Sequence, residues 1–306
     1  VVAIGSGTLC DLAKFAGDKL GLAVLLYPPA ASMNGYTSSI VALKVRGLKR
    51  TLPCRPALGV FADPEVAATA PLRMTAAGVG DFLSKCSSSA DWRAAHMIRG
   101  GYYCDRPREF FEGTQERLLD AAPRVPEGDS AAVGVVMEAL LLSGFSMVVA
   151  GSSAPASGGE HLISHYLDMK SALYGTQHDL HGAQVGVATV DCLRLWEKVL
   201  ALDPVSLDAE ALVAAQPSEE QIRAWVEADW AHVAPEVLTQ WCEKRLDAAA
   251  MRAEIEALRT LLPRVGEAVQ ADLLPSDVVA RAIAASGGPI GPEDLTAPVD
   301  EYRNAA

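Results

Sequence analysis

The sequence predicts a fold in two parts, an α/β part that ends near residue 71 and an all-α part that follows it. Short β-branched runs beside Gly- or Pro-containing turns occupy the first 70 residues. Beyond Pro71 these runs stop, and Ala, Leu, Glu and Arg recur at helical spacing to the end of the chain. The 306 residues, 50% of them hydrophobic, allow a sizeable core and favour two domains, 1–71 and 72–306.

The chain opens with a predicted strand, turn and helix. Residues 1–4 are a β-branched run, and residues 5–8 (Gly-Ser-Gly-Thr) form a flexible turn after it. A helix is expected next, because the following apolar residues lie at helical spacing: Leu9, Leu12, Ala13, Ala16 and Leu20.

Three more strand segments complete the predicted α/β part. The apolar run 22–27 lacks polar residues, so we expect a strand buried on both faces of a parallel sheet. Residues 40–52 alternate and turn at Gly47, which predicts a hairpin, and residues 57–62 predict one more strand. In the helical part, the Gly-, Ser- and Ala-rich stretch 151–159 is expected to lie close to the active site.

The net charge of −12 and pI near 5.0 argue against nucleic acid and against an anionic membrane as partners. The charge is uneven, because residues 1–70 carry net +3 and the remainder −15. An anionic ligand therefore meets its most favourable field in the N-terminal part. The basic residues between Lys44 and Arg55 either attract a substrate phosphate or are solvated charges on the hairpin.

We expect a cytoplasmic protein. Its six cysteines show no Cys-x-x-Cys spacing and are interpreted as reduced core thiols, and no signal peptide precedes the first strand. No apolar run is expected to reach the ~18 residues that span a bilayer. Because the chain starts on a strand without a Met, the gene is expected to encode a further βαβ unit of roughly 30 or more residues upstream of Val1.

The turn at residues 5–8 lies where a phosphate could bind. Backbone N–H groups at a helix N-terminus form an anion site, and glycine lets a phosphate approach closely. A purely structural turn is the alternative, since the full G-x-G-x-x-G pattern is missing. A second strand exit, residues 29–39, is rich in small and hydroxyl side chains, and neighbouring strand ends are where α/β sheets bind ligands.

The histidines are clustered. Four of the six lie between His161 and His181, and His161 and His165 share one helix face at i and i+4. With Asp81, two imidazoles would form a three-ligand site typical of a catalytic metal. The alternative for Asp81 is a charge at a helix start, favoured by the helix dipole. His178 is expected at the surface near a helix end, and His96 and His232 are expected to be ordinary polar residues.

In combination these residues resemble the bacterial sn-glycerol-1-phosphate dehydrogenases, within the iron-containing alcohol dehydrogenase and glycerol dehydrogenase superfamily. The resemblance extends from Val1 to about Leu195. It rests on these segments: Ile-Gly-Ser-Gly-Thr at 4–8, Ala-Ser-Met-Asn-Gly-Tyr-Thr-Ser-Ser at 31–39, Thr-Leu-Pro-Cys at 51–54, Ala-Ala-Gly-Val-Gly-Asp at 76–81, Ala-Asp-Trp at 90–92, Gly-Glu-His-Leu-Ile-Ser-His-Tyr-Leu-Asp at 159–168 and His-Gly-Ala-Gln-Val-Gly at 181–186.

The resemblance implies a dehydroquinate synthase-like architecture, in which a nucleotide-binding domain, here truncated at its start, precedes a helical metal-binding domain. It implies NAD(P)-linked interconversion of dihydroxyacetone phosphate and sn-glycerol 1-phosphate by a homo-oligomer. One divalent metal (Zn, Ni or Fe) would be held by Asp81, His161 and His181, and the catalytic residues facing the substrate would be Asn34, Asp81 and His165. The residues that would bind NAD or NADP are Gly5, Ser6, Gly7, Thr8, Asp11, Pro29, Ala30, Ala31, Ser32 and Ser38.

Three features depart from the family pattern: Asn34 replaces the usual Asp, Ala183 replaces the usual Glu, and the first part of the nucleotide-binding domain is absent. They leave three alternatives open. One is a dehydrogenase of another polyol, such as glycerol, and another is a non-catalytic protein that retains the fold. A third, a reaction of the dehydroquinate synthase type, is expected to use Glu in place of Asp81 and lysine-rich phosphate contacts, neither of which is found in the sequence.

Overall fold

The computed structural model describes residues 1–45 and 48–306. A parallel sheet in the order β1-β2-β5 is built from β1 (Val2–Ile4), β2 (Leu25–Tyr27) and β5 (Gly59–Val60). Helix α1 (Gly7–Leu20) connects β1 to β2, so the strand–turn–helix prediction is confirmed. The expectation that β2 is buried on both faces holds for Leu26, whereas Leu25 and Tyr27 are half-buried.

The predicted hairpin is present as a separate two-stranded sheet. Strands β3 (Ile40–Val45) and β4 (Leu48–Pro53) pair antiparallel, with Val45 opposite Leu48. The predicted turn residue, Gly47, lies outside the described residues. The hairpin packs against α1 and α7, and it therefore links the α/β part to the helical part.

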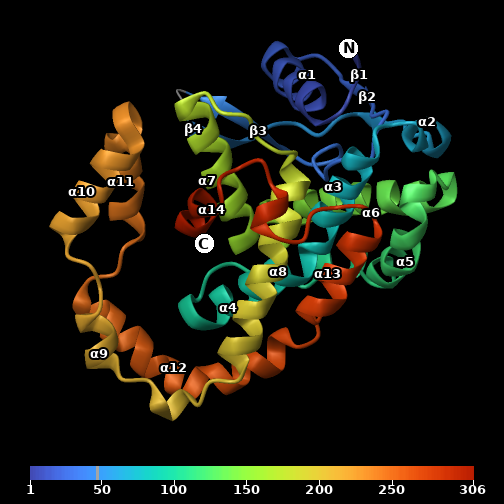
Figure 1. Ribbon diagram of the computed structural model, residues 1–306. Helices are drawn as coiled ribbons and strands as arrows, with labels where there is room; N and C mark the ends of the chain where they lie inside the picture. Colours follow the sequence, from blue (N-terminus) through green and yellow to red (C-terminus); the bar gives the residue numbers. More distant parts are fainter. Residues whose placement is uncertain (46–47) are drawn as a thin grey trace.

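From residue 72 onward the structure is helical (Figure 1), which confirms the predicted change of fold class. The division into domains at residues 71 and 72 stays a prediction, and it falls between α2 and α3. The helices are α2 (Pro64–Ala68), α3 (Leu72–Leu83), α4 (Lys85–Arg99), α5 (Thr114–Ala121), α6 (Ser130–Ala150), α7 (Gly159–Tyr174), α8 (His181–Leu200), α9 (Ala209–Ala214), α10 (Glu219–Trp230), α11 (Ala234–Lys244), α12 (Ala248–Val269), α13 (Ser276–Ala285) and α14 (Val299–Ala305).

The main core lies between α3, α5, α6, α8 and α13, and it includes Leu26 of the parallel sheet. Helix α6, with a mean hydropathy of 2.0, is long and apolar enough to cross a membrane, so the expectation that no apolar run reaches this length is wrong. In the fold, 56% of its apolar window is buried, and it contacts α2, α3 and α5. These contacts make α6 a central helix of the core.

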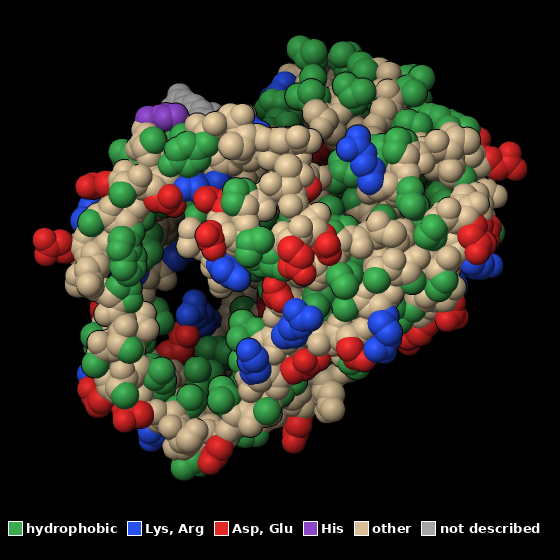
Figure 2. Space-filling view, viewed as in Figure 1, with side chains coloured by type: hydrophobic (Ala, Val, Ile, Leu, Met, Phe, Trp, Pro, Cys, Tyr) green, Lys and Arg blue, Asp and Glu red, His purple; other side chains and the backbone are tan. Residues whose placement is uncertain are grey.

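The apolar stripe that predicts α1 is not the buried face of that helix. Leu9, Leu12 and Leu20 are 54%, 50% and 71% exposed, and the helix instead buries Cys10, Asp11, Lys14 and Gly17. Figure 2 shows hydrophobic side chains gathered over α1 and β1. The face turned toward the hairpin is thus the more polar one, because Lys14 and Asp11 bond to the loop after β2 and to β3.

Helices α9 to α12 form an arm (Figure 1). The chain leaves the core after α8, passes through α9 to α10 and α11, which lie toward the hairpin, and comes back to the core along α12. The tip of the arm is fastened to α7, where the Lys170 ammonium lies 2.5 Å from Asp229 and Trp230 packs against Tyr166. A salt bridge from Glu236 to Arg50 of β4 adds a second attachment. The cysteines are all free thiols; Cys10, Cys54 and Cys86 are buried, whereas Cys242 is exposed, so it is not a core thiol.

Candidate metal site and cofactor cavity

The structure brings Asp81, His161 and His181 together from three helices. They lie in the last turn of α3, in the first turn of α7 and at the first residue of α8. One ligand atom of each lies within 4.8 Å of the others, and the two imidazole rings are 5.1 Å apart between centroids. Two nitrogens and one carboxylate oxygen suit a catalytic divalent metal that keeps a position open for substrate.

Glycines allow α3 and α8 to come close enough for this cluster. A Cβ built on Gly182 would lie 2.0 Å from the carbonyl oxygen of Ala77, and one on Gly80 would lie 2.4 Å from that of Gly182. Any side chain there would separate the two helices, since backbone atoms occupy the space. The close crossing places Asp81 of α3 beside the N-terminus of α8, where His181 lies.

Asp81 is fully buried, and both of its oxygens have partners. Oδ2 accepts a hydrogen bond from the backbone N–H of Asn34 at 2.9 Å, and Oδ1 lies 3.3 Å from the Lys85 ammonium. The alternative in which Asp81 marks a helix start is wrong, because α3 begins at Leu72. A carboxylate at a helix C-terminus is disfavoured by the dipole, and the buried Lys85 compensates for this one.

His161 is oriented by a buried carboxylate. Its Nδ1 lies 2.8 Å from Oε1 of Glu160, a fully buried side chain that also accepts hydrogen bonds from Ser87 and from the backbone of Gly158. Burial opposes the charge of Glu160, but the hydrogen bond from His161 and those from its other partners hold the pKa of its carboxyl below the usual value. Nδ1 therefore carries the proton, and Nε2 keeps its lone pair for a metal.

His181 is oriented in an equivalent way by neutral groups. The Ser164 hydroxyl donates its only proton to Oε1 of Gln184 at 2.8 Å, so it accepts the hydrogen bond that His181 Nδ1 makes at 3.0 Å. Ser164 and Gln184 are fully buried. Burial, followed by repulsion from the charge of Lys49, lowers the pKa of His181 well below its usual value. A neutral imidazole with a free Nε2 is the form that binds a metal.

Glu160→Gln tests the carboxylate behind His161. We expect the variant to fold and to bind a divalent metal about 10–100-fold more weakly, the usual cost of losing an outer partner of a metal ligand. The measurement is a titration with Zn²⁺ or Co²⁺. Ser87→Ala is the matched control, since it removes a different hydrogen bond of Glu160 and should have a smaller effect. Equal affinity of Glu160→Gln and the unchanged protein would contradict this role.

A cavity of about 630 Å³ extends from His161 and His181 to the start of α1. Six of the residues expected to bind the cofactor line it: Ser6, Gly7, Thr8, Asp11, Ser32 and Ser38. The other four, Gly5, Pro29, Ala30 and Ala31, are not among the lining residues. The loop 29–39 is held by Lys14, whose buried ammonium donates to the carbonyls of Gly35 and Ile40, so its shape is fixed by packing.

The remaining candidates, Asn34 and His165, also line this cavity. The Asn34 side chain donates to the Ser143 hydroxyl of α6 at 3.2 Å, so its amide is held by the core. The His165 ring lies 6.3 Å from that of His161 and 6.1 Å from that of His181. Burial lowers the pKa of His165 to about 3, assisted by the charge of Lys49, so its imidazole is neutral near pH 7.

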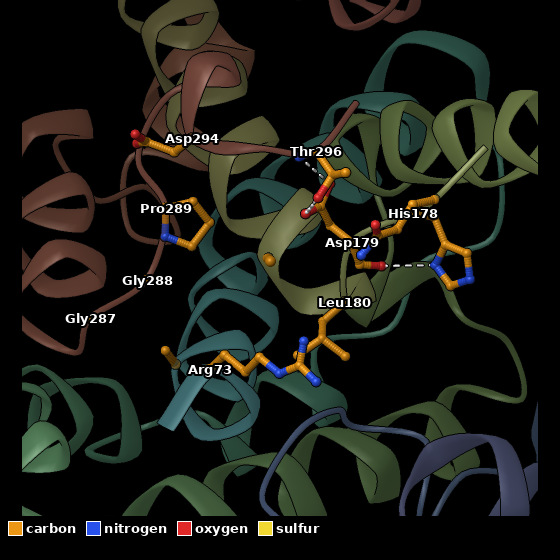
Figure 3. A pocket seen from close by; sticks show the side chains of 12 residues that line it. Arg73, His178, Asp179, Leu180, Gly287, Gly288, Pro289, Asp294 and Thr296 are labelled. Carbon is orange, nitrogen blue, oxygen red and sulfur yellow. Dashed lines mark hydrogen bonds between the residues drawn. The ribbon is translucent and has the colours of Figure 1, made fainter. Parts of the chain in front are cut away.

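A second cavity, of about 500 Å³, shares three residues with the first: His178, Asp179 and Leu180 (Figure 3). The segment that carries them leads directly into His181. It is fastened by Asp179, whose carboxylate accepts hydrogen bonds from the backbone and the hydroxyl of Thr296 at 2.8 and 2.6 Å. Ala183 lines this second cavity and not the first. The replacement of the family's usual Glu by Ala183 therefore lies outside the cavity that His161 and His181 line.

The polar residues of the site that were not predicted from the sequence are Lys49, Lys85, Glu160, Ser164, Asp168 and Gln184. Glu160 directly precedes His161 and Lys85 follows Asp81 by one turn, so proximity to the predicted ligands could have indicated both. Lys49 belongs to the basic hairpin, whose charges are either solvated or directed at a ligand. Its side chain is only 10% exposed and lines the cavity, so Lys49 is not a solvated surface charge.

An α/β unit with a Gly-containing turn between strand and helix, packed beside helices that carry a His-His-Asp cluster, is typical of the dehydroquinate synthase-like class of folds. The family described as iron-containing alcohol dehydrogenase matches residues 1–71. A glycerol-1-phosphate dehydrogenase [NAD(P)+] of Geobacillus thermodenitrificans is 34% identical over 257 residues, 78% of this chain and 64% of the relative. One of Thermococcus kodakarensis is 37% identical over 203 residues, 65% of this chain and 57% of the relative.

The chain thus spans somewhat less than two thirds of these relatives. Among solved structures, a probable glycerol dehydrogenase from Sinorhizobium meliloti has the same fold, with a TM-score of 0.53 and 22% identity, over 86% of this chain and 77% of its own. Residues 1–71 match the iron-containing alcohol dehydrogenase family, and over most of its length the sequence is similar to the glycerol-1-phosphate dehydrogenases. The resemblance read from the sequence is confirmed.

Proposed function

We propose that the protein is a metal-dependent, NAD(P)-linked oxidoreductase that interconverts dihydroxyacetone phosphate and sn-glycerol 1-phosphate. The observation that carries the proposal is one cavity with two ends. His161 and His181 lie at one end, and the backbone turn Ser6–Gly7–Thr8 of α1 lies at the other. A substrate at the metal and a nicotinamide dinucleotide on the turn would therefore share one cavity. The similarity to the Geobacillus and Thermococcus enzymes supports the same activity.

The chain's own residues would bind and orient the reactants. When bound, a divalent metal would polarise the substrate oxygen and the nicotinamide would carry the hydride. Asp81, His161 and His181 would hold the metal, with tautomers set by Glu160 and Ser164. The neutral His165 would hydrogen-bond a substrate oxygen and transfer its proton.

The partners in this proposal are a polyol phosphate, NAD or NADP and, in a homo-oligomer, further copies of the chain; nucleic acid and membrane are not among them. The location we propose is the cytoplasm.

Metal analysis together with paired assays on glycerol 1-phosphate and glycerol, with NAD⁺ and with NADP⁺, tests the activity. One bound metal per chain and a preference for the phosphate ester are expected. Preference for free glycerol would favour a different polyol dehydrogenase, and absent turnover with metal bound would favour a non-catalytic protein.

His165→Ala separates the substrate role from the metal role. We expect the variant to keep its metal and to lose about 10-fold or more of kcat/KM for glycerol 1-phosphate, since a hydrogen bond to a charged or reacting group is worth roughly 1.5–3 kcal/mol. The measurement combines metal content with steady-state kinetics. His96→Ala is the control, because His96 is exposed and does not line the cavity. Unchanged kcat/KM for His165→Ala would show that this histidine does not contact the substrate.

A further inference from the structure

Hairpin β3–β4 forms one wall of the cavity, and two of its lysines face each other there. In the strand register Lys44 lies opposite Lys49, and Ala42 lies opposite Thr51. All four residues line the cavity. Like charges directly opposite one another on antiparallel strands are destabilising. An anion bound between the two ammonium groups would remove that cost.

Lys49 is fixed in direction by a carboxylate of α7. Its ammonium lies 2.6 Å from Oδ2 of Asp168, and the side chain is 10% exposed. An ammonium group has three donors, and this is the one hydrogen bond that Lys49 makes within residues 1–45 and 48–306. Asp168 therefore holds the lysine in place and leaves two N–H donors for a ligand.

Of the three carboxylates that line the cavity, Asp179 accepts hydrogen bonds from Thr296 and the other two are paired with lysines. Asp168 is matched by Lys49, and Asp11, also in the cavity, lies 3.4 Å from the buried Lys14. Lys44 has no salt-bridge partner in the part of the chain that the structure describes. Anion binding at this wall would thus meet one lysine already oriented and one uncompensated positive charge.

Lys49 lies at the end of a row of side chains that begins at the candidate metal. His161, His165 and Asp168 occupy positions i, i+4 and i+7 of α7, and all three line the cavity. At a rise of 1.5 Å per residue, the row is about 10 Å long. The row leads from the candidate metal ligand His161, past the neutral His165, to Asp168, which holds Lys49 of β4.

We propose that Lys49 and Lys44 form the subsite for the terminal phosphate of the substrate, a phosphate monoester dianion. The proposal rests on the proposed function and deepens it. A three-carbon polyol phosphate whose hydroxyl end lies near His161 and His181 would extend along α7, past His165, and bring its phosphate to the two lysines. Lys49 is then the residue that distinguishes a phosphorylated polyol from a free one.

The test uses the metal-loaded protein and three variants. Lys49→Met removes the charge, Lys49→Arg retains it together with a partner for Asp168, and Lys198→Met is the control, because Lys198 is exposed on α8 and lies outside the cavity. Each protein is assayed with glycerol 1-phosphate and with glycerol, the KM for NAD(P)⁺ is measured, and inorganic phosphate is titrated calorimetrically. Metal content and Tm verify that each variant is folded.

We expect Lys49→Met to lose about 10–100-fold of kcat/KM for glycerol 1-phosphate, the range for a hydrogen bond between charged groups. Its kcat/KM for glycerol and its KM for NAD(P)⁺ should not change, its affinity for inorganic phosphate should fall, and Lys49→Arg should recover most of the loss.

If Lys49→Met keeps the preference for the phosphate ester, the subsite is wrong and the proposed function stands. If instead the KM for NAD(P)⁺ rises, the lysines serve a cofactor phosphate, and the subsite is equally wrong. An unchanged protein without any preference would overturn the proposed function itself.

Discussion

His181→Ala should abolish stoichiometric metal binding. His181 supplies one of three ligand atoms that lie within 4.8 Å of one another. Loss of an outer partner alone costs roughly 10–100-fold in affinity, so loss of the ligand should cost more than that. The two remaining side chains, Asp81 and His161, cannot replace it. Turnover with any polyol should fall with the metal.

Two measurements check this result. Elemental analysis after dialysis should give about one metal per chain for the unchanged protein and none for the variant. A metal that binds only the folded state stabilises it by about 2.7 kcal/mol at a free concentration of 100 times Kd, and Tm therefore rises with the metal concentration. His181→Ala should lack this increase. His178→Ala is the matched control, because His178 precedes the same helix and lines the same cavity without belonging to the cluster. Full metal content in His181→Ala would remove His181 from the site.

The order of elements was predictable from local patterns, because strands, turns and helices follow from spacing within a few residues. The cluster of histidines was visible for the same reason, since His161 and His181 are close in sequence. Orientation of α1 was not. Its stripe of Leu9, Leu12 and Leu20 indicates a helix, but only the position of the hairpin shows that the opposite face is buried.

The residues that complete the site depend on contacts between distant parts of the chain. Lys49 and Asp168 are 119 positions apart, so nothing in the sequence near Lys49 distinguishes a solvated lysine from one directed into a cavity. Ser164 and Gln184 look like ordinary polar residues until the crossing of α7 and α8 brings them to His181. Composition and spacing indicate which groups a site contains, whereas helix packing determines which of them meet.

Gly182→Ala should lower both the stability of the protein and its affinity for the metal. The added Cβ would lie 2.0 Å from the oxygen and 2.6 Å from the carbon of the Ala77 carbonyl, and 3.1 Å from the Cβ of Asp81. These are mainly backbone atoms of α3, so the two helices must separate. Overpacking of this kind costs typically 1–3 kcal/mol. Because the variant acts where Asp81 and His181 approach each other, the same movement should spread the ligand atoms.

Thermal unfolding and a metal titration of the same samples test this coupling. For a chain larger than 250 residues, each 1 kcal/mol corresponds to roughly 2–4 °C or less in Tm, so a decrease of several degrees is expected together with weaker metal binding. Gly101→Ala is the matched control, since a Cβ there meets no atom within 4 Å. Its Tm and metal affinity should equal those of the unchanged protein. A Gly182→Ala variant with a lower Tm but full metal affinity would show that the α3–α8 crossing stabilises the fold without positioning the ligands.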